Sequence, residues 1–323
     1  MEIATTDYHT AGEPFRIVAE GEVEVPGATV RERRELAPAT EEVDRVRRLL
    51  CHEPRGHADM YGCFLSPPDD DGADLGVLFW HKDGYSTACG HGTIAQRVWA
   101  VESGQVAAEP DGEIDVTIDV PSGRVVARVR CRAGAVEAVA FRNVPSFVVA
   151  RGVRVADTEV DIAYGGALYA FVSADRVGVH VVPADLPELI RVGRGIKGAL
   201  VGHELACHPS DDRLSGIYGT VVHEEVGPLH LRNVAIFADG EVDRSPTGSA
   251  TSARTALLLD DGVLSAGQTW RNDSIIGTTF HARAIGTADE GVLTEVEGMA
   301  YRTGEHRFVF ENQDPLGTGF VLR

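Results

Sequence analysis

Two short segments share a pattern of small residues in which Cys89 and Thr247 hold matching places. Residues 88–95 read ACGHGTIA, and residues 246–253 read PTGSATSA. Each segment is a turn that opens into a run compatible with a helix, so each would offer unpaired backbone N–H groups to an anion such as a carboxylate. The near-repeat therefore predicts two anion-binding helix starts, of which only one carries a thiol.

Cys89 is the cysteine with an activating context. The start of a helix lowers the pKa of a thiol, because the dipole and the free N–H groups there favour the thiolate. Other cysteines, such as Cys63 and Cys131, lie among apolar or strand-forming residues and are expected to be buried structural thiols. The asymmetry between Cys89 and Thr247 predicts one proton-abstracting base and not two.

The segments that would position these residues are richer in strand patterns than in helical ones. Helices are predicted at residues 39–50, 91–103, 186–202 and 248–259. Strands are predicted at residues 114–120, 125–130, 135–141, 146–149, 168–172, 234–238 and 308–310. A helix placed similarly in two strand-rich halves of about 150 residues indicates a duplicated α+β fold, with the crossover near residues 143–145.

Composition excludes several classes of protein. The formal net charge of −19 over 323 residues argues against nucleic acid, whose phosphates require clustered Lys and Arg. No apolar run approaches the roughly 20 residues of a membrane span, and the N-terminal residues do not resemble a signal peptide. With five cysteines, an odd number, we expect free thiols in a reducing cytoplasm.

Three motifs resemble known sites without their required context. Residues 193–198 read GRGIKG but follow a helical pattern instead of a strand, which disfavours a dinucleotide site. His203 and His208 are spaced too far apart to share one face of a zinc-binding helix, so a helix end with a satisfied histidine is favoured. A cluster with metal-like residue types matches no tight zinc spacing: Cys51, His52, His57 and Cys63.

Longer motifs along nearly the whole chain resemble the proline racemase family. The motifs are RGHADMYG at 55–62, GYSTACGHG at 84–92, YGG at 164–166, DRSPTG at 243–248 and DPLGTGF at 314–320. The resemblance implies two pseudo-symmetric α+β halves, as in diaminopimelate epimerase-like folds, each a mainly antiparallel sheet curled around a central helix. It also implies an active site in the cleft between the halves.

The resemblance further implies a domain division in which the last strand returns to the first half. The first half would comprise residues 1–144 plus about 304–323 and carry Cys89, and the second would comprise residues 145–303 and carry Thr247. In racemases and epimerases of the family both helix starts carry cysteine. Thr247 departs from that pattern and matches the trans-3-hydroxy-L-proline dehydratase branch of the family.

Transfer of the family's roles makes Cys89 the base and gives Thr247 a place in the catalytic site. The residues that would hold the carboxylate and the amine of the substrate are Gly90, His91, Asp243, Gly248 and Ser249. Two of these have simpler interpretations. His91 could bond only the local backbone, and Asp243 could be a cap or turn acceptor ahead of the helix.

The chemistry is consistent with an elimination that needs no cofactor. N–H donors at two helix starts can stabilise the negative charge that develops when an α-proton is removed. The pKa of a threonine hydroxyl is too high for it to shuttle a proton as a thiol does, so Thr247 in place of cysteine should strongly reduce the rate of racemisation. A hydroxyl on the neighbouring carbon can instead leave as water. Either His91 or Thr247 could assist that departure, and the sequence leaves the choice open.

We therefore expect a hydro-lyase that converts trans-3-hydroxy-L-proline to Δ1-pyrroline-2-carboxylate without metal, nucleotide or flavin. The first alternative is a hydroxyproline 2-epimerase or proline racemase-like isomerase. The second is a non-catalytic protein that binds imino acids. The expected partner is a small imino acid, with neither nucleic acid nor membrane, and a homodimer is left open.

Overall fold

The computed structural model describes residues 1–323, which divide into two compact units. The first unit comprises Met1–Val139 and Met299–Arg323, and the second comprises Ala140–Gly298. No helix in either unit is both long and apolar enough to cross a lipid bilayer. The division into domains at residues 144 and 303, and the cleft expected between them, stay predictions.

The first unit contains a mixed sheet and three α-helices. Its strands are β1 (Glu2–Thr10), β2 (Glu13–Val18), β3 (Tyr61–Ser66), β4 (Leu75–His81), β5 (Gly84–Tyr85), β6 (Gly112–Val120), β7 (Gly123–Arg132) and β18 (Ala300–Val309), and β8 (Ala135–Arg142) crosses into the second unit. Its helices are α1 (Val30–Leu36), α2 (Glu41–Cys51) and α3 (Gly90–Glu102), with a 3₁₀ turn at Ala37–Ala39. The predicted hairpin of β6 and β7 is confirmed, since the two strands pair antiparallel.

The second unit repeats this composition. Its strands are β9 (Phe147–Val155), β10 (Thr158–Tyr164), β11 (Leu168–Ser173), β12 (Ile217–Gly227), β13 (His230–Phe237), β14 (Glu241–Asp243), β15 (Thr269–Ser274), β16 (Thr279–Ala288) and β17 (Gly291–Gly298). Its helices are α4 (Ala174–Val177), α5 (Leu186–Ala199) and α6 (Gly248–Asp260), with 3₁₀ turns at Pro183–Asp185, Glu204–Ala206 and Asp212–Leu214.

The two units have the same order of antiparallel and parallel strand pairs. In the first unit β2 with β3 and β4 with β6 are parallel, whereas β1 with β18, β1 with β2, β3 with β4, β4 with β5 and β6 with β7 are antiparallel. In the second unit β11 with β12 and β13 with β15 are parallel at the matching places. The prediction of an α+β fold in two related, mainly antiparallel halves is confirmed.

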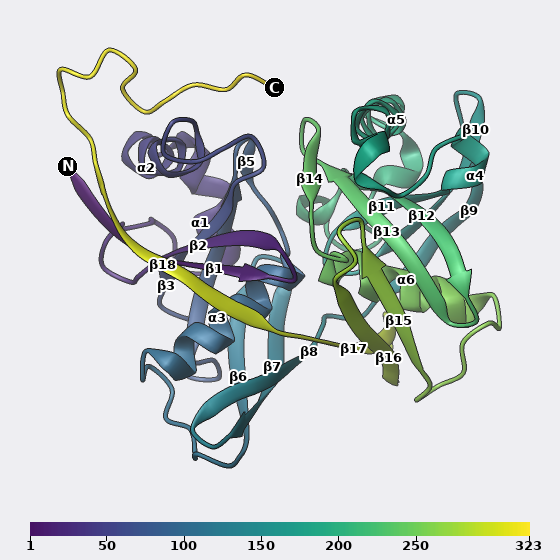
Figure 1. Ribbon diagram of the computed structural model, residues 1–323, viewed down its shortest axis with the longest axis horizontal. Coiled ribbons are helices and arrows are strands. Elements are labelled where there is room, and N and C mark those ends of the chain that lie inside the picture. The colour runs from purple at the N-terminus through teal and green to yellow at the C-terminus, as the bar shows by residue number, and fades with distance from the viewer. The chain divides into compact units, whose positions relative to one another are not determined.

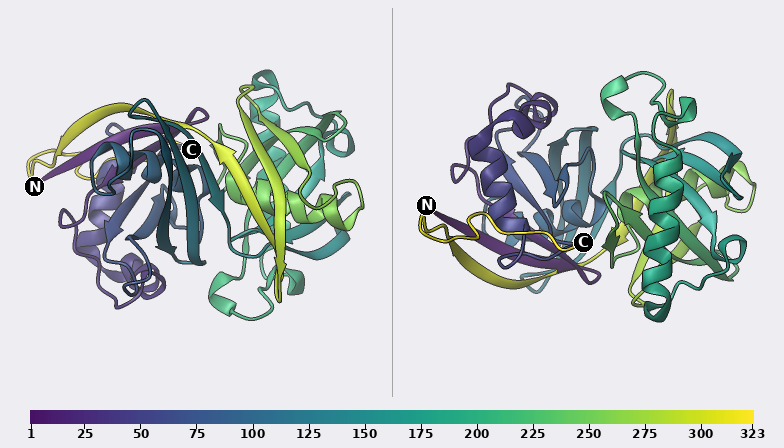
Figure 2. Two further views of the ribbon diagram at one scale, coloured as in Figure 1. Left: turned by 90° about the horizontal axis from the view of Figure 1, so that it is seen from below. Right: turned by 90° about the horizontal axis from the view of Figure 1, so that it is seen from above.

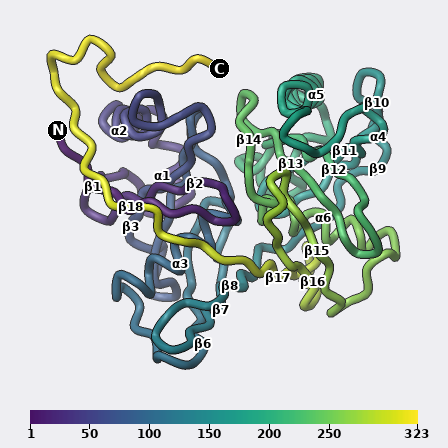
Figure 3. Tube along the Cα trace, in the orientation of Figure 1, coloured from purple at the N-terminus to yellow at the C-terminus, as the bar shows by residue number.

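The last strand belongs to the first unit, as the resemblance implied. β18 pairs antiparallel with β1, so that Val309 lies opposite Glu2. Figure 1 shows the yellow strand β18 beside the purple strand β1, and the trace in Figure 3 follows the C-terminal segment back to the N-terminal part of the chain. β18 thus fills the place beside β1 that β9 fills beside β10 in the second unit.

Each sheet curls around one helix because its strands turn small or apolar side chains inward. In the second unit Phe171 and Ala235 pack with Ala250 and Ala253 of α6, whose small side chains let the strands approach. The helix contacts strands from both ends of the sheet, β9 and β10 as well as β16 and β17. In the first unit α3 likewise contacts β1, β2, β7 and β18.

The opposite face of the second sheet is covered by α5, which Figure 2 shows as a long helix in this unit. Successive residues of a strand point to opposite faces, so Ile236 points away from α6 when Ala235 points toward it. A Cβ at Gly193 of α5 would collide with Ile236. The GRGIKG motif therefore provides close helix-to-sheet packing from within α5.

All four predicted helices are present, as α2, α3, α5 and α6, with small differences at their ends. The helix predicted at 186–202 ends earlier, at Ala199. Leu200 leaves the helical conformation, and Gly202 follows with a φ of +72°. The sequence analysis missed α1, a seven-residue helix that is capped by Thr29 and rich in charged residues.

Candidate functional site

Cys89 is the N-cap residue of α3. Its backbone is extended, with φ −152° and ψ 101°, and its sulfur accepts a hydrogen bond from the backbone N–H of Gly92 at 3.2 Å. The residue is only 5% exposed. The positive end of the helix and the N–H bond both stabilise the charged form of the sulfur. The placement predicted for Cys89 at a helix start is confirmed.

His91 lies against that sulfur. Its Nε2 is 3.4 Å and its Nδ1 is 3.6 Å from Cys89 Sγ, and the residue is 3% exposed. The rings of Phe15 and Tyr61 pack edge-on to the imidazole at centroid distances of 5.7 and 5.0 Å. The simpler interpretation of His91, a side chain that bonds only the local backbone, is wrong because the ring contacts the thiol.

Gly92 makes this close contact possible. A Cβ at this position would collide with the ring of Phe15 and would lie 2.8 Å from Cys89 Sγ. The glycine that follows His91 in the motif is therefore required by packing and by the N–H bond to the sulfur. Gly90, the first residue of α3, separates the cap from the histidine.

Thr247 is the N-cap residue of α6, but its backbone and its side chain differ from those of Cys89. Its φ is +62°, in the left-handed region that a β-branched residue rarely adopts. Its hydroxyl does not cap the helix and instead donates to Asp243 Oδ2 at 2.8 Å. Its backbone N–H donates to Ser245 Oγ at 3.1 Å. Thr247 thus leaves the N–H groups of the first turn of α6 uncapped.

Asp243 is 2% exposed and holds this turn in place. Its Oδ1 accepts from the backbone N–H of Ser245 at 2.8 Å, while its Oδ2 accepts from Thr247. The interpretation of Asp243 as a turn acceptor is confirmed by these two bonds. Holding a residue at positive φ costs on the order of 1–3 kcal/mol, and such conformations cluster at functional sites.

Ser249 and Gly248 complete the first turn of α6. The hydroxyl of Ser249 forms a 2.7 Å hydrogen bond with the hydroxyl of Tyr169, and both residues are buried. Gly165, from the YGG motif, packs so closely that a Cβ there would collide with the carbonyl oxygen of Ser249. The YGG motif therefore serves to bring a turn against the start of α6.

The structure thus brings the predicted residues together in two groups, one at each helix start. Cys89, Gly90 and His91 lie at the start of α3. The second group lies at the start of α6 and consists of Asp243, Thr247, Gly248 and Ser249. The sequence analysis missed the supporting residues Ser245, Tyr169, Phe15 and Tyr61. Two of them had a signal, since Ser245 lies within the DRSPTG motif and Tyr61 within the RGHADMYG motif.

Other cysteines lack this environment. Burial raises the pKa of Cys63 to about 12 despite hydrogen bonds from Gln96 and Val18, so Cys63 stays a thiol at neutral pH. Cys51 and Cys131 are buried as well, and Cys207 is exposed. His203 accepts from the backbone N–H of Leu205 beside a 3₁₀ turn, as expected of a satisfied histidine.

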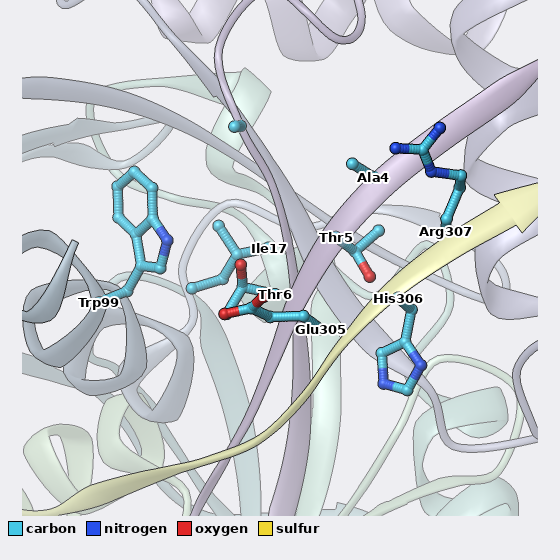
Figure 4. A pocket seen from close by; sticks show the side chains of 9 residues that line it. Ala4, Thr5, Thr6, Ile17, Trp99, Glu305, His306 and Arg307 are labelled. Atoms are coloured by element: carbon cyan, nitrogen blue, oxygen red, sulfur yellow. The ribbon is translucent and has the colours of Figure 1, made fainter.

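A cavity of about 390 Å³ in the first unit lies away from these groups. In Figure 4, Trp99 comes from α3, whereas Glu305, His306 and Arg307 come from β18. None of the predicted site residues lines this cavity. Its charged side chains are already paired: His306 with Asp7, Arg307 with Glu2 and Glu305 with Arg302. The cavity size alone therefore assigns no chemistry to it.

Comparison with known proteins places this geometry in a family. The profile described as "Proline racemase" matches residues 5–321. A trans-3-hydroxy-L-proline dehydratase of Bacillus thuringiensis is 41% identical over 98% of this chain and 97% of its own. A 3-hydroxyproline 2-epimerase of Burkholderia multivorans is 42% identical over 99% of this chain and 98% of its own. The crystal structure of a hydroxyproline epimerase from Agrobacterium vitis with bound trans-4-hydroxy-L-proline is 28% identical, with a TM-score of 0.91 over 99% of this chain and 96% of that chain.

Proposed function

We propose, for a chain that belongs to the proline racemase family, the dehydration of trans-3-hydroxy-L-proline to Δ1-pyrroline-2-carboxylate without a cofactor. The observation that carries the proposal is the unequal pair of helix starts. One has a thiol in contact with an imidazole, and the other has a hydroxyl bonded to a carboxylate. An isomerase of this type needs a proton donor on each face of the α-carbon, and Thr247 is too weak an acid to be the second one.

In this proposal the Cys89 thiolate removes the α-proton. The electrons of the C–H bond form a double bond between the α- and β-carbons as the bond from the β-carbon to its hydroxyl breaks. The departing oxygen takes one proton and leaves as water. The enamine then loses the proton on nitrogen and gains one at the β-carbon, which gives Δ1-pyrroline-2-carboxylate.

The proton on the departing water comes from His91 in this scheme. The descriptor trans places the 3-hydroxyl opposite the carboxylate and hence on the face of the ring that carries the α-hydrogen. The base and the acid must therefore act on the same face. His91 lies 3.4 Å from Cys89, so an imidazolium formed by taking the thiol proton is on the side of the base. Afterwards Cys89 returns the abstracted proton to His91.

The substrate would be held by the two helix starts. The uncapped N–H groups of Gly248 and Ser249 suit the carboxylate, with Gly90 and His91 contributing from the other helix start. Asp243 would attract the ring amine while its second oxygen keeps Thr247 oriented. A reducing cytoplasm is the setting in which Cys89 would persist as a free thiol.

Proton NMR in deuterated water tests the proposal. The purified protein is incubated with trans-3-hydroxy-L-proline, and separately with trans-4-hydroxy-L-proline and with L-proline. Loss of the 3-hydroxyproline signals with growth of Δ1-pyrroline-2-carboxylate is expected. Inversion or deuterium exchange of the other substrates without elimination would contradict the dehydratase.

Two cysteine variants provide the matched control. Cys89→Ser should abolish turnover, because an alcohol is too weakly acidic to serve as the base. Cys207→Ser, which changes an exposed thiol in the second unit, should leave turnover unchanged. Retained turnover in Cys89→Ser would overturn the assignment of the base.

A hydroxyproline 2-epimerase is the second candidate. The observation that favours it is the relative of that name, whose identity to this chain equals that of the dehydratases to within a few per cent. An epimerase would invert the α-carbon without releasing water, so the same NMR experiment separates the two functions.

A further inference from the structure

The inner face of the second unit's sheet changes from apolar to polar toward one end. Phe171 on β11 and Val221 on β12 belong to the apolar cluster around α6. Two residues further along each strand, on the same face, stand Ser173 and His223, which lie opposite each other in the parallel pair. On β10 the inward-facing Asp161 lies opposite Phe171. The interior of the curled sheet therefore opens at this end into a polar mouth.

This mouth contains a cavity of about 250 Å³. A space of this size accepts a small molecule or several waters, since one water occupies about 30 Å³ of the liquid. The mouths of curled sheets are common ligand sites. The residues that line the cavity come from β9 to β12, α4 and α6, and are Arg151, Gly152, Glu159, Asp161, Phe171, Ser173, Arg176, His223, Arg254 and Asp261.

The acidic side chains around the cavity are already paired. Asp161 and Asp261 both contact Arg151, at 3.0 and 2.8 Å. Glu159 contacts Arg176 at 2.6 Å. Asp161 and Asp261 thus share one guanidinium, and the three carboxylates exceed Arg151 and Arg176 by one charge. None of them is within ion-pair distance of the remaining arginine of the cavity.

That arginine is Arg254, which projects from α6. It has neither an ion-pair partner nor a hydrogen-bond partner, its Nε is buried and unsatisfied, and its side chain lines the cavity. Burial lowers the pKa of Arg254, and the nearby Asp261 and Asp161 only partly offset this through their charges. An arginine nevertheless stays protonated, so one positive charge is left without a contacting partner.

His223 offers a second unsatisfied group beside it. Its Nδ1 is buried and has no hydrogen-bond partner. Burial and the positive charge of Arg254 lower the pKa of His223 well below its usual value, so the ring is neutral at neutral pH. A neutral imidazole with a buried nitrogen beside an unpaired guanidinium is costly unless a ligand supplies the missing bonds.

We propose that this cavity is a binding site for a small, singly charged oxyanion, held by the guanidinium of Arg254 with His223 and Ser173 as polar neighbours. Arg254 is the one cation of the cavity without a contacting carboxylate, and a singly charged anion adds the least to the acidic charge already around it. A planar carboxylate also matches the fork of the guanidinium. A larger anionic charge would be repelled by Asp161, Glu159 and Asp261.

The first unit offers a comparison for the position of Arg254. Gln96 stands as far beyond Cys89 as Arg254 stands beyond Thr247, and Gln96 is fully buried and neutral. Its side chain interacts with Cys63 of β3. The neighbouring Arg97 of α3 is also fully buried, but its guanidinium donates to the carbonyl oxygens of Thr93 and Val125. Arg254 makes no such bond, which supports a binding role for it over a structural one.

NMR of the full-length protein labelled with ¹⁵N-arginine tests the site. The Nε–Hε signal of Arg254 is identified by its absence from the spectrum of Arg254→Lys, which keeps the charge. Sodium acetate, sodium phosphate and sodium chloride are then titrated at matched ionic strength. A saturable shift of the Arg254 signal with acetate or with phosphate, but not with chloride, is expected. The signal of Arg283, an arginine paired with Glu295 on the same unit, should stay in place.

The response to each salt identifies the source of the oxyanion. A shift with acetate alone indicates an organic carboxylate, and a shift with phosphate alone indicates inorganic phosphate. No saturable shift with either salt overturns the proposal. Because the signal belongs to Arg254 itself, an anion bound at the helix starts of α3 or α6 does not produce the expected result.

A thermal-stability measurement gives an independent check. The oxyanion that shifts Arg254 should raise the unfolding temperature of the wild type. Arg254→Gln, which copies the residue of the first unit, should weaken binding on the order of tenfold or more, because a charge-assisted bond is lost. An unchanged affinity in Arg254→Gln would exclude the site. If that variant does not fold, Ser173→Ala serves in its place, with a smaller loss expected.

Discussion

Cys89 Sγ lies 3.4 Å from Nε2 of His91, the second residue of the helix that the cysteine caps. The sulfur also accepts a hydrogen bond from the N–H of Gly92, and the imidazole packs nearly at right angles to the rings of Phe15 and Tyr61. The thiol is therefore held between a helix start and a proton acceptor, two features that favour a thiolate. This pair makes the start of α3 chemically different from the start of α6.

His91→Gln should separate the role of the imidazole from that of the thiol. The variant loses the group that exchanges a proton with Cys89, so kcat for dehydration is expected to fall by about 10²–10⁴-fold. Alkylation of Cys89 by iodoacetamide at pH 7 should slow on the order of tenfold, because less thiolate is present. Mass spectrometry of the Cys89 peptide distinguishes this reaction from alkylation of the exposed Cys207. An unchanged alkylation rate would mean that the helix start alone activates the thiol.

Thr247→Cys should gain exchange of the α-hydrogen with solvent on the second face of a hydroxyproline. A thiol can shuttle a proton there, whereas the threonine hydroxyl cannot. Thr247→Ser is the matched control, since it keeps a hydroxyl that can bond Asp243 and gains no proton donor. Epimerisation and deuterium incorporation are followed by NMR. Their absence in Thr247→Cys, with the protein folded, would count against equivalent roles for the two cap residues.

Gly92→Ala should damage both stability and activity. The added Cβ collides with Phe15 and crowds Cys89 Sγ, so we expect a loss of about 1–3 kcal/mol in the free energy of unfolding. Gly195→Ala in α5 is the control, because a Cβ there meets nothing within 4 Å. That change should stabilise the helix by about 0.5–1 kcal/mol. Urea denaturation measures both values, and equal effects of the two substitutions would contradict the packing argument.

The stability of the second unit should depend on the ionisation of Asp273. Burial raises the pKa of Asp273, but hydrogen bonds from Arg271, Thr279 and His230 outweigh burial and lower it to about 2. An aspartate in the unfolded chain has a pKa of about 3.9. The ionised form therefore stabilises the fold above that pH, and this contribution is lost as the pH falls toward 2.

Asp273→Asn tests this dependence. The variant should be less stable than the wild type at pH 7, and the difference should shrink as the pH falls from about 4 to 2. Asp289→Asn, which changes an exposed aspartate of the same unit, should leave the profile unaltered. Chemical denaturation at several pH values gives the comparison. A constant difference across that range would show that Asp273 does not titrate as the hydrogen bonds indicate.

The sequence alone determined the family, the α+β fold and the position of both helix starts. It did so because small residues, a cap position and a helical run are local features, and residues 88–95 and 246–253 carry all of them. The same local reasoning identified Cys89 as the cysteine at a helix start. It missed α1, because five of the seven residues of this short helix are charged and leave too few apolar residues to show a helical period.

Only the tertiary structure decided what surrounds those residues. The contact of His91 with the thiol depends on Phe15 of β2 and Tyr61 of β3, which are distant in sequence. The left-handed backbone of Thr247 depends on hydrogen bonds to Asp243 and Ser245. The motif supplies these two residues, but only the folded turn sets their orientation.

The unpaired charge of Arg254 is likewise a property of the assembled unit. Nothing near it in the sequence distinguishes it from an ordinary helix-surface arginine; the curled sheet encloses it. Periodicity and spacing fix which face of an element a side chain occupies, whereas its charge balance and its hydrogen-bond partners are set by strands that meet it only after folding.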